Sequence, residues 1–184
     1  MAKLKLGILV GSNRRASINR KLALAYARLG GEVFDSKLLQ IDDLPLYNQD
    51  NEEPSPPPVA RFKAEIAACD ALLFVTPEHD RSIPALLKNA IDWGARPYGK
   101  NSFRGKPAAV TGTSGGVIST AIAQAHLRAV LGSGIAIHVM GGEAYIQFKP
   151  DLIDDQGNVA DENVAKFLKT YIEQFAEFAG RLAR

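Results

Sequence analysis

The sequence predicts an α/β domain built on a parallel sheet, with helices on both of its faces. Short apolar runs recur along the chain, and residues 4–10 and 71–76 are the clearest of them. Between these runs, apolar residues return at three- and four-residue steps, which is typical of amphipathic helices. Strands that alternate with helices pair in parallel, because each helix has to cross a face of the sheet before the next strand begins.

The elements follow in a regular order along the chain. The expected strands cover residues 4–10, 32–38, 71–76, 107–112 and 135–139, and the expected helices cover residues 17–29, 57–68, 83–93, 117–131 and 162–182. Gly30 and the glycine after it end the first helix, and Pro57 or Pro58 suits the first turn of the second. Ser82 is expected to cap the third helix, with Pro84 in its first turn.

Length and composition fit one domain that spans residues 1–184. A chain of this size buries roughly 70% of the surface that it exposes when unfolded. The net charge of +2 is too small, and the cations too scattered, for a nucleic-acid-binding protein. The single cysteine, Cys69, excludes an intrachain disulfide and a cysteine zinc site, and no metal site is predicted. We expect Cys69, His126 and His138 to be packing residues.

The chain shows no signal-peptide pattern and no apolar run near the ~20 residues that a membrane span needs. A cytoplasmic protein without membrane partners is the simplest expectation.

The residues after the first strand are suited to bind a phosphate group. The segment reads Gly11-Ser12-Asn13-Arg14-Arg15-Ala16-Ser17-Ile18-Asn19-Arg20 and lies between a strand and a helix. The N-terminus of a helix offers unpaired N–H donors and a partial positive charge. Ser12, Ser17 and Asn19 add neutral donors, and Arg14 can bind a phosphate through two N–H groups at once. The alternative is that Ser17 only caps the helix and Arg14 is a solvated charge.

Two further loops are expected at the same edge of the sheet, where ligands bind in folds of this class. The loop after the third strand offers polar groups and a flat imidazole ring, in Pro77, Glu78, His79 and Asp80. The loop after the fourth strand is rich in glycine, which lets backbone N–H groups approach a ligand closely, and it contains Thr113, Ser114, Gly115 and Gly116.

Three kinds of phosphorylated ligand compete for these loops. An ATP or GTP site needs a Gly-Lys-Ser/Thr motif after the first strand, and the sequence has none. A dinucleotide site needs three glycines, of which only Gly11 is present, although Asp35 lies about where a ribose-binding acid would fall. FMN fits best, because the flavodoxin-like fold binds it at the first switch point through hydroxyl-rich loops.

With the three loops in view, the chain resembles the NADPH-dependent FMN reductase family, and most closely its bacterial quinone reductase branch, often called chromate reductases. The resemblance extends from Leu4 to about the last helix. It rests on Gly11-Ser12-x-Arg14-x-x-Ser17-x-Asn19, on Leu44-Pro45-Leu46-Tyr47-Asn48 and on the run from Pro77 to Trp93. It implies a flavodoxin-like, doubly wound, five-stranded parallel sheet with helices on both faces.

The resemblance also implies where FMN would lie. Its phosphate would contact the first loop, through Ser12, Asn13, Arg14, Ser17, Ile18 and Asn19. Its ring would lie against Pro77, Glu78, His79 and Asp80, and the pyrimidine side of the ring against Thr113, Ser114, Gly115 and Gly116. The family usually has Tyr and Asn where this chain has His79 and Asp80, so these two positions bear on flavin affinity and substrate preference.

The activity implied by the resemblance is a two-electron reduction by a ping-pong mechanism. NAD(P)H would deliver a hydride to N5 of bound FMN, and a quinone would then take its place. Chromate, azo dyes and ferric chelates are expected side substrates. No side chain is expected to act as an essential general acid, because water can supply the protons. Arg96 is a candidate to attract NADPH or oxyanion acceptors, and a homodimer or homotetramer is expected.

Two other functions stay open. One is a flavodoxin-type electron carrier, although such carriers usually present strongly acidic faces, whereas this chain is slightly basic. The other is a reductase that releases free reduced FMN. The sequence decides neither the preference between NADH and NADPH nor the physiological acceptor.

Overall fold

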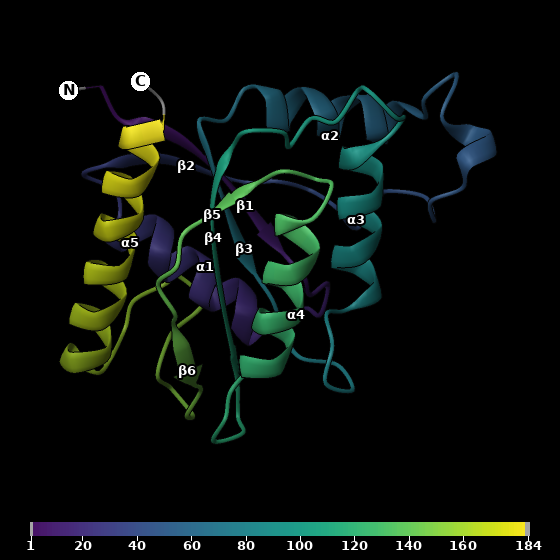
Figure 1. The fold of residues 1–184 in the computed structure, drawn as a ribbon. Helices are drawn as coiled ribbons and strands as arrows, with labels where there is room; N and C mark the ends of the chain where they lie inside the picture. The colour runs from purple at the N-terminus through teal and green to yellow at the C-terminus, as the bar shows by residue number, and fades with distance from the viewer. Residues whose placement is uncertain (1, 183–184) are drawn as a thin grey trace.

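The computed structural model describes residues 2–182, which form a sheet covered by helices on both faces (Figure 1). The strands are β1 (Leu4–Val10), β2 (Phe34–Leu38), β3 (Ala71–Val75), β4 (Pro107–Ser114), β5 (His138–Val139) and β6 (Tyr145–Gln147). The helices are α1 (Ile18–Leu29), α2 (Pro57–Ala67), α3 (Ala85–Ala95), α4 (Ala121–Gly132) and α5 (Glu162–Leu182), with a short 3₁₀ helix at Gln49–Asn51.

The strands lie in the order β2-β1-β3-β4-β5, and every neighbouring pair is parallel. The chain therefore turns one way from β1 to β2 and the other way to β3, which creates a switch point at the carboxyl end of β1. This confirms the predicted doubly wound sheet. The structure adds β6, which pairs in parallel with the last residues of β4, from Gly112 to Ser114.

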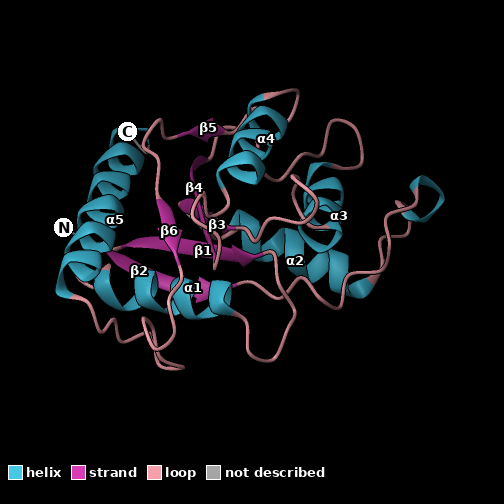
Figure 2. Cartoon of the chain, turned by 90° about the horizontal axis from the view of Figure 1, so that it is seen from below, coloured by secondary structure: helices cyan, strands magenta, loops and turns pink. Residues whose placement is uncertain are grey.

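Each face of the sheet has its own apolar layer. One layer joins α1 and α5 to the sheet, and the other joins α2, α3 and α4 to it; Figure 2 shows the two groups of helices on opposite sides. Strand β1 contributes to both, since Ile8 belongs to the first layer and Leu9 to the second. The helices thus return the chain to the amino edge after each strand, and the loops that follow the strands collect at the carboxyl edge.

The fifth and sixth strands differ from the prediction. The strand expected over residues 135–139 is only two residues long, because Ala136 takes a φ of 57° that no strand permits. Strand β6 was not predicted, because it has only three residues, which are too few to show an alternating pattern. Strand β2 begins at Phe34 rather than at residue 32, because the N–H groups of Val33 and Phe34 both donate hydrogen bonds to the carbonyl of Gly30.

The starts of two helices also differ. Helix α3 begins at Ala85 with Pro84 as its N-cap, so the expected cap by Ser82 is wrong. Helix α4 begins at Ala121 rather than at residue 117, because Ser119 has a φ of 52° and its hydroxyl donates to the carbonyl of Ile146. The residues before α4 instead form a turn that faces the end of β4.

Cys69 is buried, as expected, and burial raises the pKa of its thiol. The packing role expected for His126 and His138 is wrong, because both side chains are exposed. No helix within residues 2–182 has the length and apolar character that crossing a membrane requires. In the same part of the chain, His, Cys, Asp and Glu side chains form no cluster that could hold a metal ion.

Candidate functional site

The three loops meet in a cavity of about 270 Å³ at the carboxyl edge of the sheet, which we call the three-loop cavity. It is lined by Ser12, Arg14, Ser17, Ile18, Asn19, Pro77, Glu78, His79, Thr113, Ser114 and Gly115. Every one of these residues belongs to the set expected from the sequence. The folded chain therefore brings together side chains and backbone groups from three separate parts of the sequence.

The first loop presents a continuous run of unused backbone donors. Within residues 2–182, no N–H group from Ser12 to Asn19 donates a hydrogen bond to another group of the protein. The N–H groups on either side of this run are both used. That of Gly11 donates to the carbonyl of Val75, and that of Arg20 donates to the hydroxyl of Ser17. Such a run at the start of a helix is suited to an anion.

Ser17 is the N-cap of α1 and is almost fully buried, with 4% of its surface exposed. Its extended backbone, with φ of −73° and ψ of 115°, places its hydroxyl where it accepts the N–H of Arg20 at 3.1 Å. One hydroxyl satisfies only one of the free N–H groups of the first turn, so the others remain available. Arg14 is exposed beside them and adds a positive charge.

Asn19 joins the first loop to the loop after β4. Its side-chain amide donates to the carbonyl of Thr113 at 2.9 Å, and its amide oxygen accepts the N–H of Thr113 at 3.0 Å. The hydroxyl of Thr113 donates to the carbonyl of Ile146 at 2.6 Å. The polar groups of both side chains are thus used within the protein, and we assign them a positioning role instead of a contact with the phosphate or the ring.

Two glycines allow the loops to approach one another. A Cβ at Gly11 would lie 3.0 Å from the Pro84 side chain and 3.1 Å from that of Pro77. A Cβ at Gly112 would lie 2.0 Å from the carbonyl oxygen of Thr76, which is closer than any real contact. The absence of a side chain at these positions draws the ends of β1, β3 and β4 together around the cavity.

The loop after β3 ends in a tight turn. The N–H of His79 donates to the carbonyl of Ser82, and the N–H of Ser82 donates back to His79. Between them, Asp80 and Arg81 have φ values of 48° and 64°, as a type I′ turn requires. Such a conformation costs a non-glycine residue roughly 1–2 kcal/mol, so neighbouring contacts need to hold it.

Glu78 provides such a contact. One oxygen of its carboxylate accepts the N–H groups of Ile122 and Ala123, at 3.1 and 3.0 Å, in the first turn of α4. The other accepts from the guanidinium of Arg81 at 3.0 Å. In addition, the hydroxyl of Ser82 and Nδ1 of His126 share a hydrogen bond of 2.9 Å. The carboxylate expected near the ring thus faces α4 and fixes the shape of the loop.

Four expected residues do not line the three-loop cavity. Asp80 is exposed within the tight turn, and Gly116 is exposed beyond the cavity, where its N–H donates to the hydroxyl of Ser114. Asn13 faces a neighbouring pocket. Arg96 follows the last residue of α3, about 16 Å along the helix from the loop, so this chain's own cavity does not include it.

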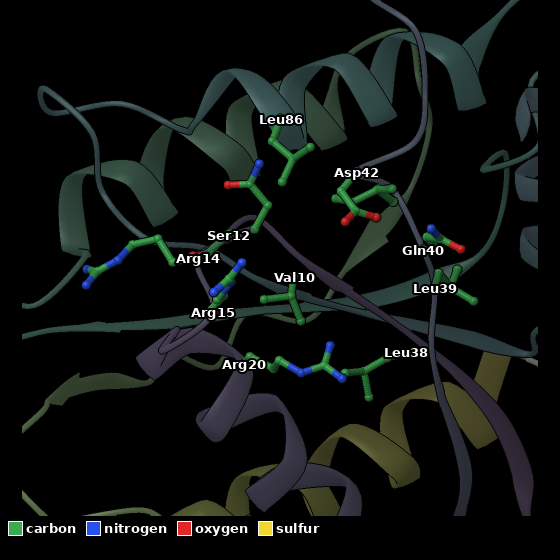
Figure 3. A pocket seen from close by; sticks show the side chains of 12 residues that line it. Val10, Ser12, Arg14, Arg15, Arg20, Leu38, Leu39, Gln40, Asp42 and Leu86 are labelled. Carbon is green, nitrogen blue, oxygen red and sulfur yellow. The ribbon is translucent and has the colours of Figure 1, made fainter. Parts of the chain in front are cut away.

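That neighbouring pocket has a volume of about 470 Å³ and lies between the first loop and the residues after β2 (Figure 3). Arg15 and Arg20 line it, and neither is among the site residues expected from the sequence. The signal that could have found them is the concentration of cations in this segment, since Arg14, Arg15, Arg20 and Lys21 lie close together in the sequence.

A model of the NADPH-dependent FMN reductase family matches residues 4–151. The chain belongs to this family. A 2-hydroxy-1,4-benzoquinone reductase of a Burkholderia species is 44% identical to it over 173 residues, which are 94% of each chain. A quinone reductase of Pseudomonas putida is 42% identical over 174 residues, which are 94% of this chain and 93% of the relative. The resemblance on which the site residues were chosen is therefore confirmed at the level of the family.

Two solved structures have the same fold as this chain. The flavoenzyme NAD(P)H:(acceptor) oxidoreductase FerB of Paracoccus denitrificans superposes with a TM-score of 0.92, at 43% identity, over 97% of this chain and 98% of its own. A WrbA-like flavodoxin of Agrobacterium tumefaciens, at 16% identity, superposes with a TM-score of 0.65 over 97% of this chain and 99% of its own. This second likeness shows that the fold is flavodoxin-like.

Proposed function

We propose that the protein holds FMN in the three-loop cavity and transfers two electrons from NAD(P)H to quinones. The observation that carries the proposal is the run of unused N–H donors from Ser12 to Asn19 at the start of α1. Family membership and the quinone reductases among the relatives support the choice of FMN and of the acceptor.

The donors present fit the phosphate of FMN. A phosphate group offers several anionic oxygens, and the first loop offers backbone N–H groups, the hydroxyl of Ser12 and the guanidinium of Arg14. No carboxylate from this loop opposes them. Because Asn13 faces the neighbouring pocket, it contributes only its backbone N–H to binding of the phosphate.

The other two loops would hold the ring. Bound FMN supplies a ring that accepts two electrons from NAD(P)H and passes them to an acceptor. Pro77 and His79 border the cavity on one side, and Ser114 and Gly115 border it on another. Glu78 holds the first of these loops against α4, so the surface offered to the ring is fixed before it binds. Since His79 is exposed at this border, water reaches the site and can supply the protons that a quinone takes up.

The same open site would serve the donor and the acceptor in turn, which is a ping-pong mechanism. We include chromate as a side substrate, since a site that admits anionic NAD(P)H also admits a small oxyanion. We further propose a homodimer, or a pair of dimers, in the cytoplasm. Val117, Ile118 and Ile122 support the dimer, because these apolar side chains are 86%, 50% and 42% exposed beside the glycine-rich loop.

The test is an absorbance spectrum of the purified protein, followed by anaerobic addition of NADPH and then of benzoquinone. The expected result is a flavin spectrum that bleaches with NADPH and returns with the quinone. A flavin spectrum that NADPH does not bleach would support the electron carrier. Separation of the bleached flavin from the protein by gel filtration would support the release of free reduced FMN. A protein without flavin that binds no added FMN would overturn the proposal.

A further inference from the structure

The pocket on the other side of the first loop, which we call the arginine pocket, is larger than the three-loop cavity. Its volume is about 470 Å³, against about 270 Å³. It lies at the carboxyl ends of β1 and β2, which are neighbours in the sheet. A pocket of this size is in the range of sites for small organic ligands.

The arginine pocket carries positive charge that the protein does not neutralise. It is lined by Arg14, Arg15 and Arg20, and Asp42 is its single acidic residue. Within residues 2–182, none of the three guanidinium groups forms an ion pair or donates a hydrogen bond, whereas the adjacent Lys21 is paired with Asp155 at 3.1 Å. In Figure 3, Arg20 extends toward Leu38, while Arg14 points away from the residues after β2. Arg15 and Arg20 are therefore free for a ligand of this pocket, and Arg14 for the three-loop cavity.

Beside the polar residues Ser12, Asn13 and Gln40, the pocket has an apolar wall that comes from several elements. Val10 ends β1, Leu38 ends β2, Leu39 and Ile41 follow it, and Leu86 belongs to α3. Contact with an apolar surface does not stabilise a bare anion such as phosphate or chromate, whereas it does stabilise a bound purine ring. Apolar walls beside unpaired guanidinium groups favour a phosphorylated nucleoside over a simple oxyanion.

The two pockets share a wall. Ser12 and Arg14 line both the arginine pocket and the three-loop cavity. A ligand with two joined halves can therefore place one half at each side of the first loop. In dinucleotide-binding sheets, the residues after the second strand lie beside the adenosine ribose, and an arginine there accommodates a 2′-phosphate. Arg20 and the residues after β2 lie together in this region.

We propose that the arginine pocket binds the 2′-phosphorylated adenosine half of NADPH, with Arg15 and Arg20 at the 2′-phosphate. This inference rests on the proposed function, since it places the nicotinamide half over the three-loop cavity. It makes NADPH the preferred reductant over NADH, which lacks the 2′-phosphate. Because three arginines and only one acidic residue, Asp42, line the pocket, its net charge stays positive, which suits a phosphate dianion.

The test compares Arg15→Gln, Arg20→Gln and the double variant with the wild-type protein, with FMN present at saturation. The control is Arg104→Gln, which removes the same charge from an exposed residue just before β4, at the opposite edge of the sheet. Calorimetry measures the binding of 2′,5′-ADP and of 5′-AMP, and steady-state kinetics gives KM for NADPH and for NADH. The flavin absorbance of each sample reports FMN occupancy separately.

The double variant is expected to bind 2′,5′-ADP at least tenfold more weakly and to raise the ratio of KM for NADPH to KM for NADH at least tenfold. Binding of 5′-AMP should change less than threefold, and Arg104→Gln should change neither quantity. An unchanged ratio, or an equal rise of both KM values, would overturn the inference. So would weaker inhibition by inorganic phosphate with unchanged binding of 2′,5′-ADP, which would identify a free-anion site. Failure of the wild-type protein to bind FMN would instead refute the proposed function.

Discussion

Asn19 and Thr113 lie 94 positions apart in the sequence and form a reciprocal pair of hydrogen bonds, from the Asn19 amide to the Thr113 carbonyl and from the Thr113 N–H back to the amide oxygen. A side chain thus completes the backbone pairing that a neighbouring strand would otherwise provide. Both residues are buried, at 2% and 0% exposure. The pair fixes the distance between the start of α1 and the glycine-rich loop, and so sets the width of the three-loop cavity.

Asn19→Ala should lower the free energy of unfolding by about 2–4 kcal/mol, because it leaves two buried backbone groups of Thr113 without partners. Urea unfolding of the FMN-free protein measures this. Asn163→Ala, at an exposed position in α5, is the control and should change stability by no more than about 0.5 kcal/mol. Equal stabilities of the two variants would show that the pair does not hold the loops.

Substitutions at Ser17 separate helix capping from phosphate binding. Ser17→Asp should still cap the helix, since aspartate caps helices about as well as serine, but burial of its carboxylate should lower the stability of the FMN-free protein by about 1–3 kcal/mol. It should weaken FMN binding more than tenfold, because its charge repels the phosphate. Ser17→Ala should lower stability by about 1 kcal/mol. Thermal unfolding and fluorescence titration with FMN measure the two effects, and tight FMN binding by Ser17→Asp would exclude a phosphate at this helix.

Arg14→Ala should weaken FMN binding about ten- to a hundredfold, which corresponds to the roughly 1.5–3 kcal/mol of a hydrogen bond to a charged group. The loss should shrink at high salt, because Arg14 is exposed and its charge is screened. Dialysis of the purified variant, followed by the flavin absorbance, gives the remaining occupancy. Full occupancy after dialysis would remove Arg14 from the phosphate site; Arg104→Ala provides the matched loss of charge elsewhere.

Glu78→Gln should loosen the turn between His79 and Ser82. The neutral amide can still accept a hydrogen bond from α4, but it loses the attraction to the N-terminus of that helix and to Arg81. We expect a stability loss of about 1 kcal/mol and faster amide hydrogen exchange at the N–H groups of His79 and Ser82. Glu173→Gln, which removes a long surface contact in α5, is the control. Unchanged exchange in the turn would show that Glu78 does not hold it.

Tyr171 should make the protein sensitive to alkali. Its hydroxyl donates to the carbonyl of Val110 at 2.8 Å, and burial raises its pKa to about 12. An unfolded tyrosine has a pKa near 10, so the unfolded chain releases its proton first as the pH rises. Stability present below pH ~10 should therefore fall by about 2–3 kcal/mol up to pH ~12. Denaturant unfolding across this range tests it, and Tyr171→Phe should show a smaller fall than the wild-type protein.

The alternation of strands and helices and the position of the candidate site follow from local patterns in the sequence. The apolar run of residues 4–10 and the helix that starts after Ser17 are both found where the sequence predicts them. The sequence shows directly why their junction is suited to a phosphate group, since a helix start has free N–H groups and Arg14 is nearby. Strand β6 and the late start of α4 were missed, because both depend on Ser119 and Ile146, which pair only after folding.

The sequence could not predict which partners the side chains at the site bind. The side chains of Glu78 and Asn19 can form hydrogen bonds equally well with a ligand or with another part of the protein. The sequence does not show which of these partners is nearer. In the folded chain, the carboxylate of Glu78 reaches α4 and the amide of Asn19 reaches Thr113. Likewise, the role that we propose for Arg15 and Arg20 depends on the residues after β2, which line the same pocket.

The sequence by itself determined the parallel sheet with helices on both faces and the three loops at its carboxyl edge, because periodicity and helix capping act over a few neighbouring residues. The family followed from the resemblance of its motifs, and the family model confirms it. Only the tertiary structure decided which polar groups stay free for a ligand. A donor is free when no acceptor lies within hydrogen-bonding distance, and that depends on residues far away in the chain. The open N–H run from Ser12 to Asn19 and the occupied amide of Asn19, within one short segment, show both outcomes.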